Sequence, residues 1–274
     1  MNARRLFASM ALAATSLAAG ALALDRLFPP DLARYHERST EVVDANGRLL
    51  RAFTTPDGKW RMKTGVEDVD PLYLALLKAY EDRNFDRHPG VDPTAVVRAA
   101  GQLIERGRIV SGASTLSMQA ARLLEPSQLR PGTRSFTTKL IQSARALQLE
   151  WRYSKREVLA IYLTLAPMGG NLEGVRAASF AYFGKEPKRL TLAESALLVA
   201  LPQSPERRRL DRHPEAALAA RDRVLERMVE DGVVSHEEAA QARAVAVPKL
   251  RKPMPILAPH SSDAAMATVS DKTT

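Results

Sequence analysis

The pattern of apolar and polar positions divides the chain into an apolar N-terminal stretch and a long body with helical periodicity. Residues 6–24 (LFASMALAATSLAAGALAL) contain no charged side chain, and Arg4 and Arg5 precede them. After Asp70 and Pro71, apolar residues recur every three or four positions, as on one face of a helix. The first such face consists of Tyr73, Leu76, Leu77 and Tyr80. The pattern predicts a mostly α-helical protein with an apolar segment at its N-terminus.

Short polar motifs mark where the predicted elements begin, turn and end. Asn46-Gly47 lies between two apolar stretches of residues 39–53, which is the strongest short signal for a β-hairpin. Gly232 is predicted to end the helix that starts at Pro214, and residues 251–274 are predicted to form a loose tail. Capping boxes, in which Ser or Thr precedes Glu by three positions, predict three helix starts. These boxes are Ser154–Glu157, Thr191–Glu194 and Ser235–Glu238.

The apolar stretch 6–24 is just long enough to cross the hydrocarbon core of a bilayer, which takes about 20 residues. Positive charge on its N-terminal side would keep that end in the cytoplasm. Alternatively, Ala21-Leu22-Ala23 offers a cleavage site for a secretory signal peptide. We interpret residues 1–28 as a cytoplasmic stub with one transmembrane helix, or as a signal peptide. Both interpretations place the rest of the chain on the outer side of the membrane.

The amino-acid composition excludes several kinds of functional site. The chain has 274 residues, of which 45% are hydrophobic, so it is long enough to bury a core. The absence of cysteine excludes disulfides, zinc–thiolate sites and cysteine nucleophiles, and the five scattered histidines lack zinc-site spacing. No Ser-x-x-Lys motif occurs, which excludes acyl-serine chemistry of the penicillin-sensitive kind in this chain. Forty Lys and Arg against 31 Asp and Glu leave a net charge of +9. Outside the membrane, this charge favours a phospholipid surface or a phosphorylated substrate over nucleic acid.

The first candidate for chemistry is residues 81–92 (EDRNFDRHPGVD). Glu81 follows the apolar face of its helix and lies next to a second carboxylate, Asp82. The helix dipole disfavours negative charge at a helix C-terminus, so a partly desolvated glutamate there is suited to act as a general base. A solvated, charged helix end is the alternative.

The second candidate is residues 112–124 (GASTLSMQAARLL). Ser114 is predicted to cap a helix, on which Thr115, Gln119 and Arg122 follow at positions i, i+4 and i+7. A hydroxyl, an amide and a guanidinium along one stripe suit sugar hydroxyls and phosphate. An ordinary amphipathic surface helix is the alternative.

The third candidate begins at Arg134. Arg134 and Lys139 precede or open a helix on which Gln142 shares a face with Lys139. Cations in this arrangement suit a pyrophosphate, although basic residues on a helix are more often simply solvated.

Taken together and in order, these segments resemble the glycosyltransferase domain of class A penicillin-binding proteins, glycosyltransferase family 51, and within it the 1C branch. The resemblance covers about residues 40–250 and rests on five blocks in register. The blocks are EDRNFDRHPGVD, GASTLSMQAARLL, KLIQSARALQLEWRYSKREVLAIYL, AASFAYFGKEPKRLTLAESALLVALPQSP and ARDRVLERM.

The resemblance implies a mostly helical, lysozyme-like fold over residues 39–250, with a smaller jaw that dips into the bilayer. It implies polymerisation of lipid II into glycan strands at the outer, periplasmic face of the bacterial cytoplasmic (inner) membrane, to which a single span would anchor the chain. Glu81 would deprotonate the 4-hydroxyl of the acceptor sugar. That oxygen would attack the anomeric carbon of the growing strand with inversion and release undecaprenyl pyrophosphate.

The same resemblance assigns the other candidate site residues. In the first block, Asp82, Phe85 and His88 would shape the acceptor site. Ser114, Thr115, Gln119 and Arg122 belong to the second block, and Arg134 and Lys139 match basic positions associated with the donor's pyrophosphate. The family usually uses Mg²⁺ or Mn²⁺ at the leaving group, and the sequence names no metal ligand.

The chain departs from the family pattern in ways that keep alternatives open. Gln142 stands where most of the family has a second glutamate, and it cannot ionise, although it can bind substrate. Arg122 stands where Lys is usual, and Thr138 replaces a basic residue. No transpeptidase sequence follows, so a separate transpeptidase or other cell-wall proteins are expected partners. A lipid II-binding remnant without turnover and a lysozyme-like enzyme that cleaves glycans are the alternative functions.

Overall fold

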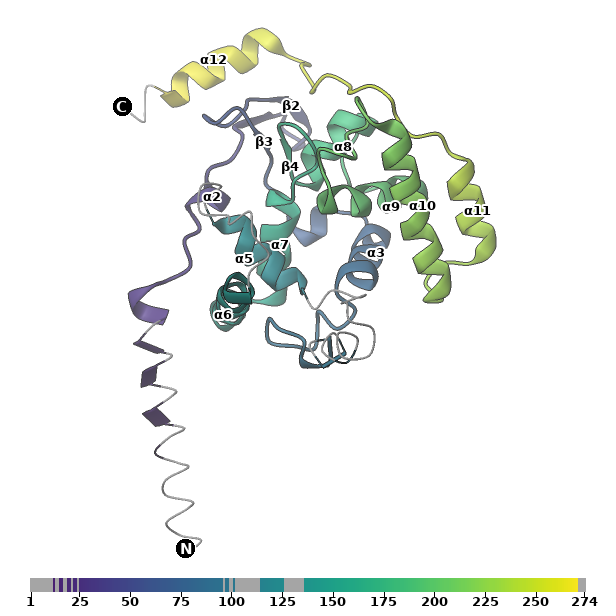
Figure 1. Ribbon diagram of the computed structural model, residues 1–274. Helices are drawn as coiled ribbons and strands as arrows, with labels where there is room; N and C mark the ends of the chain where they lie inside the picture. The colour runs from purple at the N-terminus through teal and green to yellow at the C-terminus, as the bar shows by residue number, and fades with distance from the viewer. Residues whose placement is uncertain are drawn as a thin grey trace, which may run out of the picture.

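The computed structural model describes residues 25–95, 97, 98, 101, 114–125 and 136–270, together with positions 12, 15, 16, 19, 20, 22 and 23. Helices make up most of these residues and the strands are short, so the prediction of a mostly α-helical protein is confirmed (Figure 1). The lysozyme-like architecture stays a prediction. Most of the predicted membrane span lies outside the described residues. Within the described part, none of the helices combines the length and the apolar character needed to cross a bilayer.

The helices begin where the sequence places capping residues. Asp70 caps α3 because its Oδ1 accepts a hydrogen bond from the backbone N–H of Leu72 at 2.9 Å, and Pro71 occupies the first helical position. All three predicted capping boxes are present. The described helices are α2 (Ala33–His36), α3 (Pro71–Glu81), α5 (Leu116–Leu124), α6 (Phe136–Arg152), α7 (Lys155–Leu165), α8 (Val175–Phe183), α9 (Leu192–Ala200), α10 (Pro214–Glu230), α11 (His236–Ala244) and α12 (Pro259–Ser270), with 3-10 turns η1 (Val66–Asp68) and η3 (Leu201–Gln203).

The part of the chain that the structure describes contains two short strand pairings. The predicted hairpin is confirmed, because β1 (Glu41–Val43) pairs antiparallel with β2 (Leu49–Ala52). Gly47 in its turn has a φ of +78°, which glycine adopts without the penalty of a side chain. The second pairing joins β3 (Trp60–Arg61) in parallel to β4 (Leu172–Glu173), which lies far away in the sequence. Sequence periodicity did not predict it, since each strand has only two residues.

The described helices form two packed groups (Figure 1). In the first group, α3, α10 and α11 pack around α9, of which seven of nine residues are buried. In the second group, α5 packs against α6 and α7. A helix that is apolar on all sides is expected at the centre of a core, which explains the position of α9.

A buried ion-pair cluster joins the N-terminal segment to the second helix group. Arg61 is 1% exposed, and its Nε donates a hydrogen bond to Glu173 at 2.7 Å. Arg34 of α2 donates to the other oxygen of Glu173 at 2.6 Å and to the backbone carbonyl of Leu123 in α5, also at 2.6 Å. Removing one partner of a buried ion pair typically costs about 3–5 kcal/mol. This cluster therefore fixes α2 against the C-terminal end of α5.

The segment after α11 is bound to the body of the protein. Lys252 donates a backbone hydrogen bond to the carbonyl of Ala181 at 2.7 Å, and Leu257 donates one to Leu50 of β2 at 2.9 Å. The helix α12 follows. The prediction of a loose tail for residues 251–274 is therefore wrong for its first part. The physical reason is backbone pairing with α8 and the hairpin, which the Pro- and Ala-rich composition did not indicate.

Candidate active site

Glu81, the predicted general base, is the last residue of α3 and is half-buried. Its Oε2 accepts a hydrogen bond from Nε2 of Gln119 at 2.9 Å, and its Oε1 accepts one from Nε2 of Gln203 at 2.8 Å. The structure thus brings together Glu81 and Gln119, which the sequence predicted in separate blocks. Two amide donors hold the carboxylate in one orientation, as positioned proton transfer requires.

Sequence reasoning missed Gln203. It lies on η3, 122 residues after Glu81, and nothing in the local pattern connects the two positions. The only available signal was that Gln203 falls in LPQSP, the end of the fourth block of the family resemblance. A search for polar residues at helix ends within that block would have found it.

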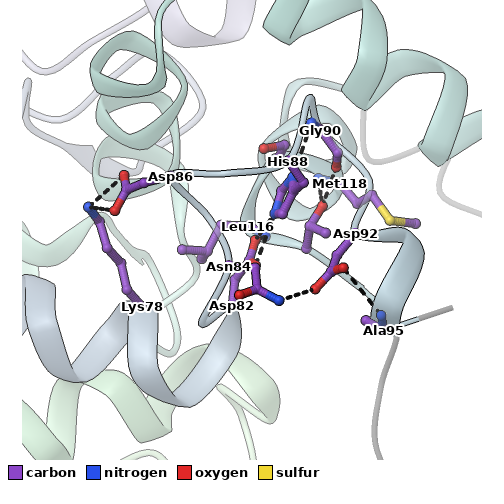
Figure 2. Close-up of polar contacts among 12 residues, drawn as sticks. Lys78, Asp82, Asn84, Asp86, His88, Gly90, Asp92, Ala95, Leu116 and Met118 are labelled. Atoms are coloured by element: carbon purple, nitrogen blue, oxygen red, sulfur yellow. Dashed lines mark hydrogen bonds and ion pairs between the residues drawn. The ribbon is translucent and has the colours of Figure 1, made fainter. Parts of the chain in front are cut away.

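The loop after Glu81 is held by a hydrogen-bond chain (Figure 2). Asp82 is 7% exposed, and its Oδ2 accepts a hydrogen bond from the backbone N–H of Leu116, the first residue of α5, at 2.8 Å. Nε2 of His88 lies 3.0 Å from Oδ1 of Asp82, and Nδ1 of His88 accepts from the backbone N–H of Gly90 at 3.1 Å. Because Nδ1 is an acceptor, the ring proton is on Nε2, which donates to Asp82. This series of hydrogen bonds fixes α5 relative to the end of α3.

Packing against α6 and α7 completes the support of this loop. Phe85 is 1% exposed, and Nζ of Lys155 lies 4.5 Å from the centre of its ring. The same Nζ donates to the carbonyl of His88 at 2.6 Å. Gly90 has a φ of +103°, and a Cβ there would lie 2.6 Å from the carbonyl oxygen of Ala146, so no other residue fits. The structure therefore gives Phe85 and His88, like Asp82, a buried, supporting position in the loop that follows Glu81.

A second carboxylate further along the loop is strongly bound. Asp92 accepts a hydrogen bond from the side chain of Asn84 at 2.9 Å (Figure 2). The hydroxyl and the backbone N–H of Thr94 also donate to Asp92, at 2.7 and 2.9 Å. Burial works against the charged form, but the hydrogen bonds from Thr94 and Asn84 outweigh it and lower the pKa of Asp92 to about 2. Asp92 therefore stays ionised and ties the far end of the loop to the residues that follow it.

The second block differs from its prediction at the helix start. Thr115, and not Ser114, caps α5, because the Thr115 hydroxyl accepts from the backbone N–H of Met118 at 3.1 Å. The same hydroxyl donates to the carbonyl of Gly90 at 2.5 Å, and Thr115 is 2% exposed. The prediction that Ser114 is the cap is wrong, because Thr115 is the residue that satisfies both α5 and the loop. Thr115 thereby supports the loop, and half-buried Ser114 precedes it.

The residues predicted to bind the donor substrate are either exposed or lie away from Glu81. Arg122 on α5 and Lys139 on α6 are both exposed. Gln142 is 9% exposed and lines a pocket of about 360 Å³ between α5, α6 and residues 29–31. The α5 residues of that pocket lie on the opposite side of the helix from Gln119, so the structure does not bring Gln142 to Glu81. Arg134 lies outside the described residues.

Two buried tyrosines accompany Glu81 inside the protein. Tyr73 and Tyr162 are at most 1% exposed, and neither hydroxyl has a hydrogen-bond partner among the described residues. Burial raises the pKa of Tyr73 and of Tyr162 well above the ordinary value, and the charge of Glu81 adds to the increase. Both hydroxyls therefore stay protonated and carry no charge that could compete with the carboxylate.

The described side chains do not fit a protein-held Mg²⁺ or Mn²⁺. They contain no group of three or more His, Asp or Glu arranged to hold a metal ion. Glu81 and Asp82 are the adjacent carboxylates of the site, and both accept hydrogen bonds from N–H donors.

Comparison with known proteins defines the class. Residues 46–229 match the transglycosylase family, and the chain belongs to it. It is 48% identical over 235 residues, 86% of its length, to penicillin-binding protein 1C of Escherichia coli (strain K12). It is 36% identical over 205 residues, 75% of its length, to penicillin-binding protein 1A of Aquifex aeolicus (strain VF5). These relatives agree with the resemblance inferred from the five sequence blocks.

The chain spans 30% and 27% of the lengths of these two relatives. Among solved structures, penicillin-binding protein 1A from Haemophilus influenzae is similar over 86% of this chain and 24% of its own, with 17% identity and a TM-score of 0.43.

Proposed function

We propose that this chain is a peptidoglycan glycosyltransferase that polymerises lipid II into glycan strands. The observation that carries the proposal is the carboxylate of Glu81, which sits at the end of α3 with Gln119 and Gln203 donating to its two oxygens. Membership of the transglycosylase family supports the same substrate class. Hydrogen bonds from Leu116 to Asp82 and from Lys155 to the carbonyl of His88 hold the loop that follows Glu81 against α5 and α7, which supports a fixed position for the carboxylate.

In the proposed reaction, Glu81 accepts the proton of the 4-hydroxyl of the acceptor sugar. The oxygen then attacks the anomeric carbon of the growing strand from the face opposite the leaving group. The bond between that carbon and the pyrophosphate oxygen breaks, so the new glycosidic bond forms with inversion, and undecaprenyl pyrophosphate leaves with the electron pair. Positioned proton transfer of this kind typically contributes about 10²–10⁴-fold to the rate.

On the donor side, we propose that Arg122, Lys139 and Arg134 bind the pyrophosphate. Arg122 and Lys139 are exposed, and cations suit this role because a polyanionic group brings two or more negative charges to one place. Gln142 would donate its amide to a sugar or phosphate oxygen from the pocket that it lines. We propose that Mg²⁺ or Mn²⁺ enters with the pyrophosphate of the substrate, which supplies the hard oxygen ligands that these ions prefer.

We propose further that the outer face of α6 rests on the phospholipid bilayer at the periplasmic side of the inner membrane. Leu140, Ala144, Leu147 and Trp151 are exposed and lie at i, i+4, i+7 and i+11, which is one stripe of the helix. Trp151 is 78% exposed, and tryptophan favours the membrane–water interface. An apolar stripe with cations beside it is typical of a helix that lies in that interface.

The segment that leads from the N-terminal apolar stretch lies along the same helix. Arg145 and Gln148 of α6 both donate to the carbonyl of Phe28 at 2.8 Å. Arg152 forms an ion pair with Asp25 at 2.7 Å. Leu27 and Phe28 are exposed beside these contacts. This arrangement supports the proposal that a membrane anchor before residue 28 and the apolar stripe of α6 face the same bilayer; the jaw that dips into it stays a prediction.

The test is polymerisation of labelled lipid II by the purified chain in detergent with Mg²⁺. Polymer length is followed on gels. The Glu81→Gln variant should lose about a hundredfold or more in rate, because an amide cannot accept the proton. Glu226→Gln, which changes an exposed glutamate on α10, is the matched control and should keep the parent rate.

The outcomes separate the alternatives. Polymer from the parent and from Glu226→Gln but not from Glu81→Gln supports the transferase. Shortening of preformed glycan would favour a lysozyme-like enzyme, which needs two carboxylates flanking the bond. Binding of lipid II without turnover in the parent would favour a binding remnant.

A further inference from the structure

The hydrogen bonds around Glu81 continue beyond its two amide partners. Gln203 uses its nitrogen for Glu81 at 2.8 Å, and its Oε1 accepts a hydrogen bond from Nη1 of Arg208 at 3.3 Å. The same Nη1 also donates to the carbonyl of Ala200 at the end of α9. Arg208 is therefore tied to the framework on one side and to Gln203 on the other. Among the described residues, no cation forms an ion pair with Glu81 itself.

The two ends of an amide are not equivalent. With Arg208 donating to its oxygen, Gln203 must turn its NH₂ group toward Glu81. The reversed orientation would place the amide oxygen against the carboxylate and the NH₂ group against the guanidinium, and both contacts are repulsive. Arg208 thus selects the orientation in which Gln203 is a donor to Glu81. Hydrogen bonds in such a chain polarise and strengthen one another.

We propose that Arg208 is a positioning residue that acts through Gln203 to hold the Glu81 carboxylate in the orientation of a base. The proposal rests on the function proposed above. An arginine in direct contact with a carboxylate lowers the carboxyl pKa by about 1–3 units and so weakens it as a base. An amide placed between the cation and the carboxylate keeps the orientation and avoids the direct ion pair. This explains why Arg208 contacts Gln203, and Gln203 contacts Glu81, without a direct contact between Arg208 and Glu81.

The experiment compares three substitutions in the full chain with lipid II as substrate. Gln203→Met removes the donor from an exposed side chain of similar length, and Arg208→Met removes the group that orients it. Arg207→Met is the matched control, because Arg207 is the exposed neighbour of Arg208 and the change in net charge is the same. We expect kcat to fall about tenfold in the first two variants, with KM within about twofold, and no change in the control. Arg208→Lys should restore part of the rate, since it keeps a cationic donor.

A pH profile distinguishes positioning from mere structural support. Gln203→Glu places a second carboxylate beside Glu81, and like charges at this distance favour protonation of one of them. The acidic limb of the rate profile should therefore move to higher pH by about one unit or more. A carbon-13 NMR titration of the Glu81 carboxyl should show the same displacement in Gln203→Glu, and it needs no turnover.

Several results would overturn the inference. If Gln203→Met and Arg208→Met match Arg207→Met in kcat, the pair does not position the base. A loss confined to KM would assign Gln203 to substrate binding. Thermal unfolding of each variant identifies a loss caused by misfolding, and the exposed Gln203 keeps the test informative if Arg208→Met unfolds. Absence of polymer from the parent would instead contradict the proposed function, and the NMR titration would then decide the inference alone.

Discussion

The loop that follows Glu81 and the outer face of α6 differ in the surroundings of their side chains. In the loop, Asp82 and His88 are buried and each polar atom has a partner within the protein. On α6, Leu147 and Trp151 are exposed without apolar cover. The comparison teaches that burial marks residues that hold the site in shape, whereas exposure marks residues available to an external partner. Substitutions in the loop should therefore damage folding and turnover together, and substitutions on α6 should affect only association.

The largest effect is expected at Gly90. Gly90→Ala combines a positive φ with a Cβ that would lie 2.6 Å from the carbonyl oxygen of Ala146, and we expect a loss of about 3 kcal/mol of stability. The polymerisation rate should fall together with stability, because the loop that follows Glu81 must move. Denaturant unfolding and the lipid II assay measure both effects. Gly58→Ala is the control, since its φ is +73° but its surroundings are open, and it should cost about 1 kcal/mol. Equal losses in the two variants would show that the close approach to α6 is unimportant.

A smaller, pH-dependent effect is expected at Asp92. Its folded-state pKa of about 2 lies below the unfolded value of about 3.9, so its stabilisation is fully present above that unfolded value. It is lost as the pH falls from about 4 toward about 2. Asp92→Asn should therefore be less stable than the parent at neutral pH, and the difference should shrink over this range in urea unfolding. Asp86→Asn changes an exposed carboxylate of the same loop and serves as the control for the loss of one carboxylate there. A constant difference at every pH would contradict the assignment.

On the α6 face, Trp151→Ser should weaken binding to phospholipid vesicles and leave turnover in detergent unchanged. The loss of one aromatic side chain from the interface predicts about tenfold weaker vesicle binding, measured by co-sedimentation. Leu250→Ser is the control, because Leu250 is also 78% exposed but does not lie on α6. If both variants bind vesicles equally, the stripe is not the membrane-facing surface.

The smallest effect is expected at Tyr162, in the interior of the protein. Tyr162 is buried, but its hydroxyl has no hydrogen-bond partner in the described part of the chain. Tyr162→Phe removes a group that gains nothing from burial, so stability should stay within about 1 kcal/mol of the parent or rise slightly. Thermal unfolding measures this. A large loss would show that the hydroxyl is hydrogen-bonded in solution.

Local patterns in the sequence predicted the helix starts and the hairpin, because Asp70, Ser154 and Asn46-Gly47 act through atoms only a few residues away. They predicted Glu81 and Gln119 as site residues but not their contact, since it depends on how α3 and α5 pack. The error at the start of α5 has a similar origin. Two adjacent hydroxyls satisfy the same local rule, and a distant partner, the carbonyl of Gly90, decides between them.

The contacts of Gln203 and of the C-terminal segment join positions far apart in the sequence, and local patterns do not predict them. Gln203 reaches Glu81 only because α9 packs against α3 and η3 follows directly at the end of α9. The C-terminal segment has the composition of a coil, yet Leu257 pairs with Leu50. Backbone pairing needs no particular side chains, so composition gives no signal for it.

The bridge between Ile256 and Arg51 has a consequence for solubility. One edge of β2 is paired with β1, and the C-terminal segment occupies the other at this point. An open strand edge offers unpaired N–H and C=O groups to a second chain and is a route to aggregation. By covering that edge with its own backbone, the protein removes a template for self-association from a surface that would otherwise invite it.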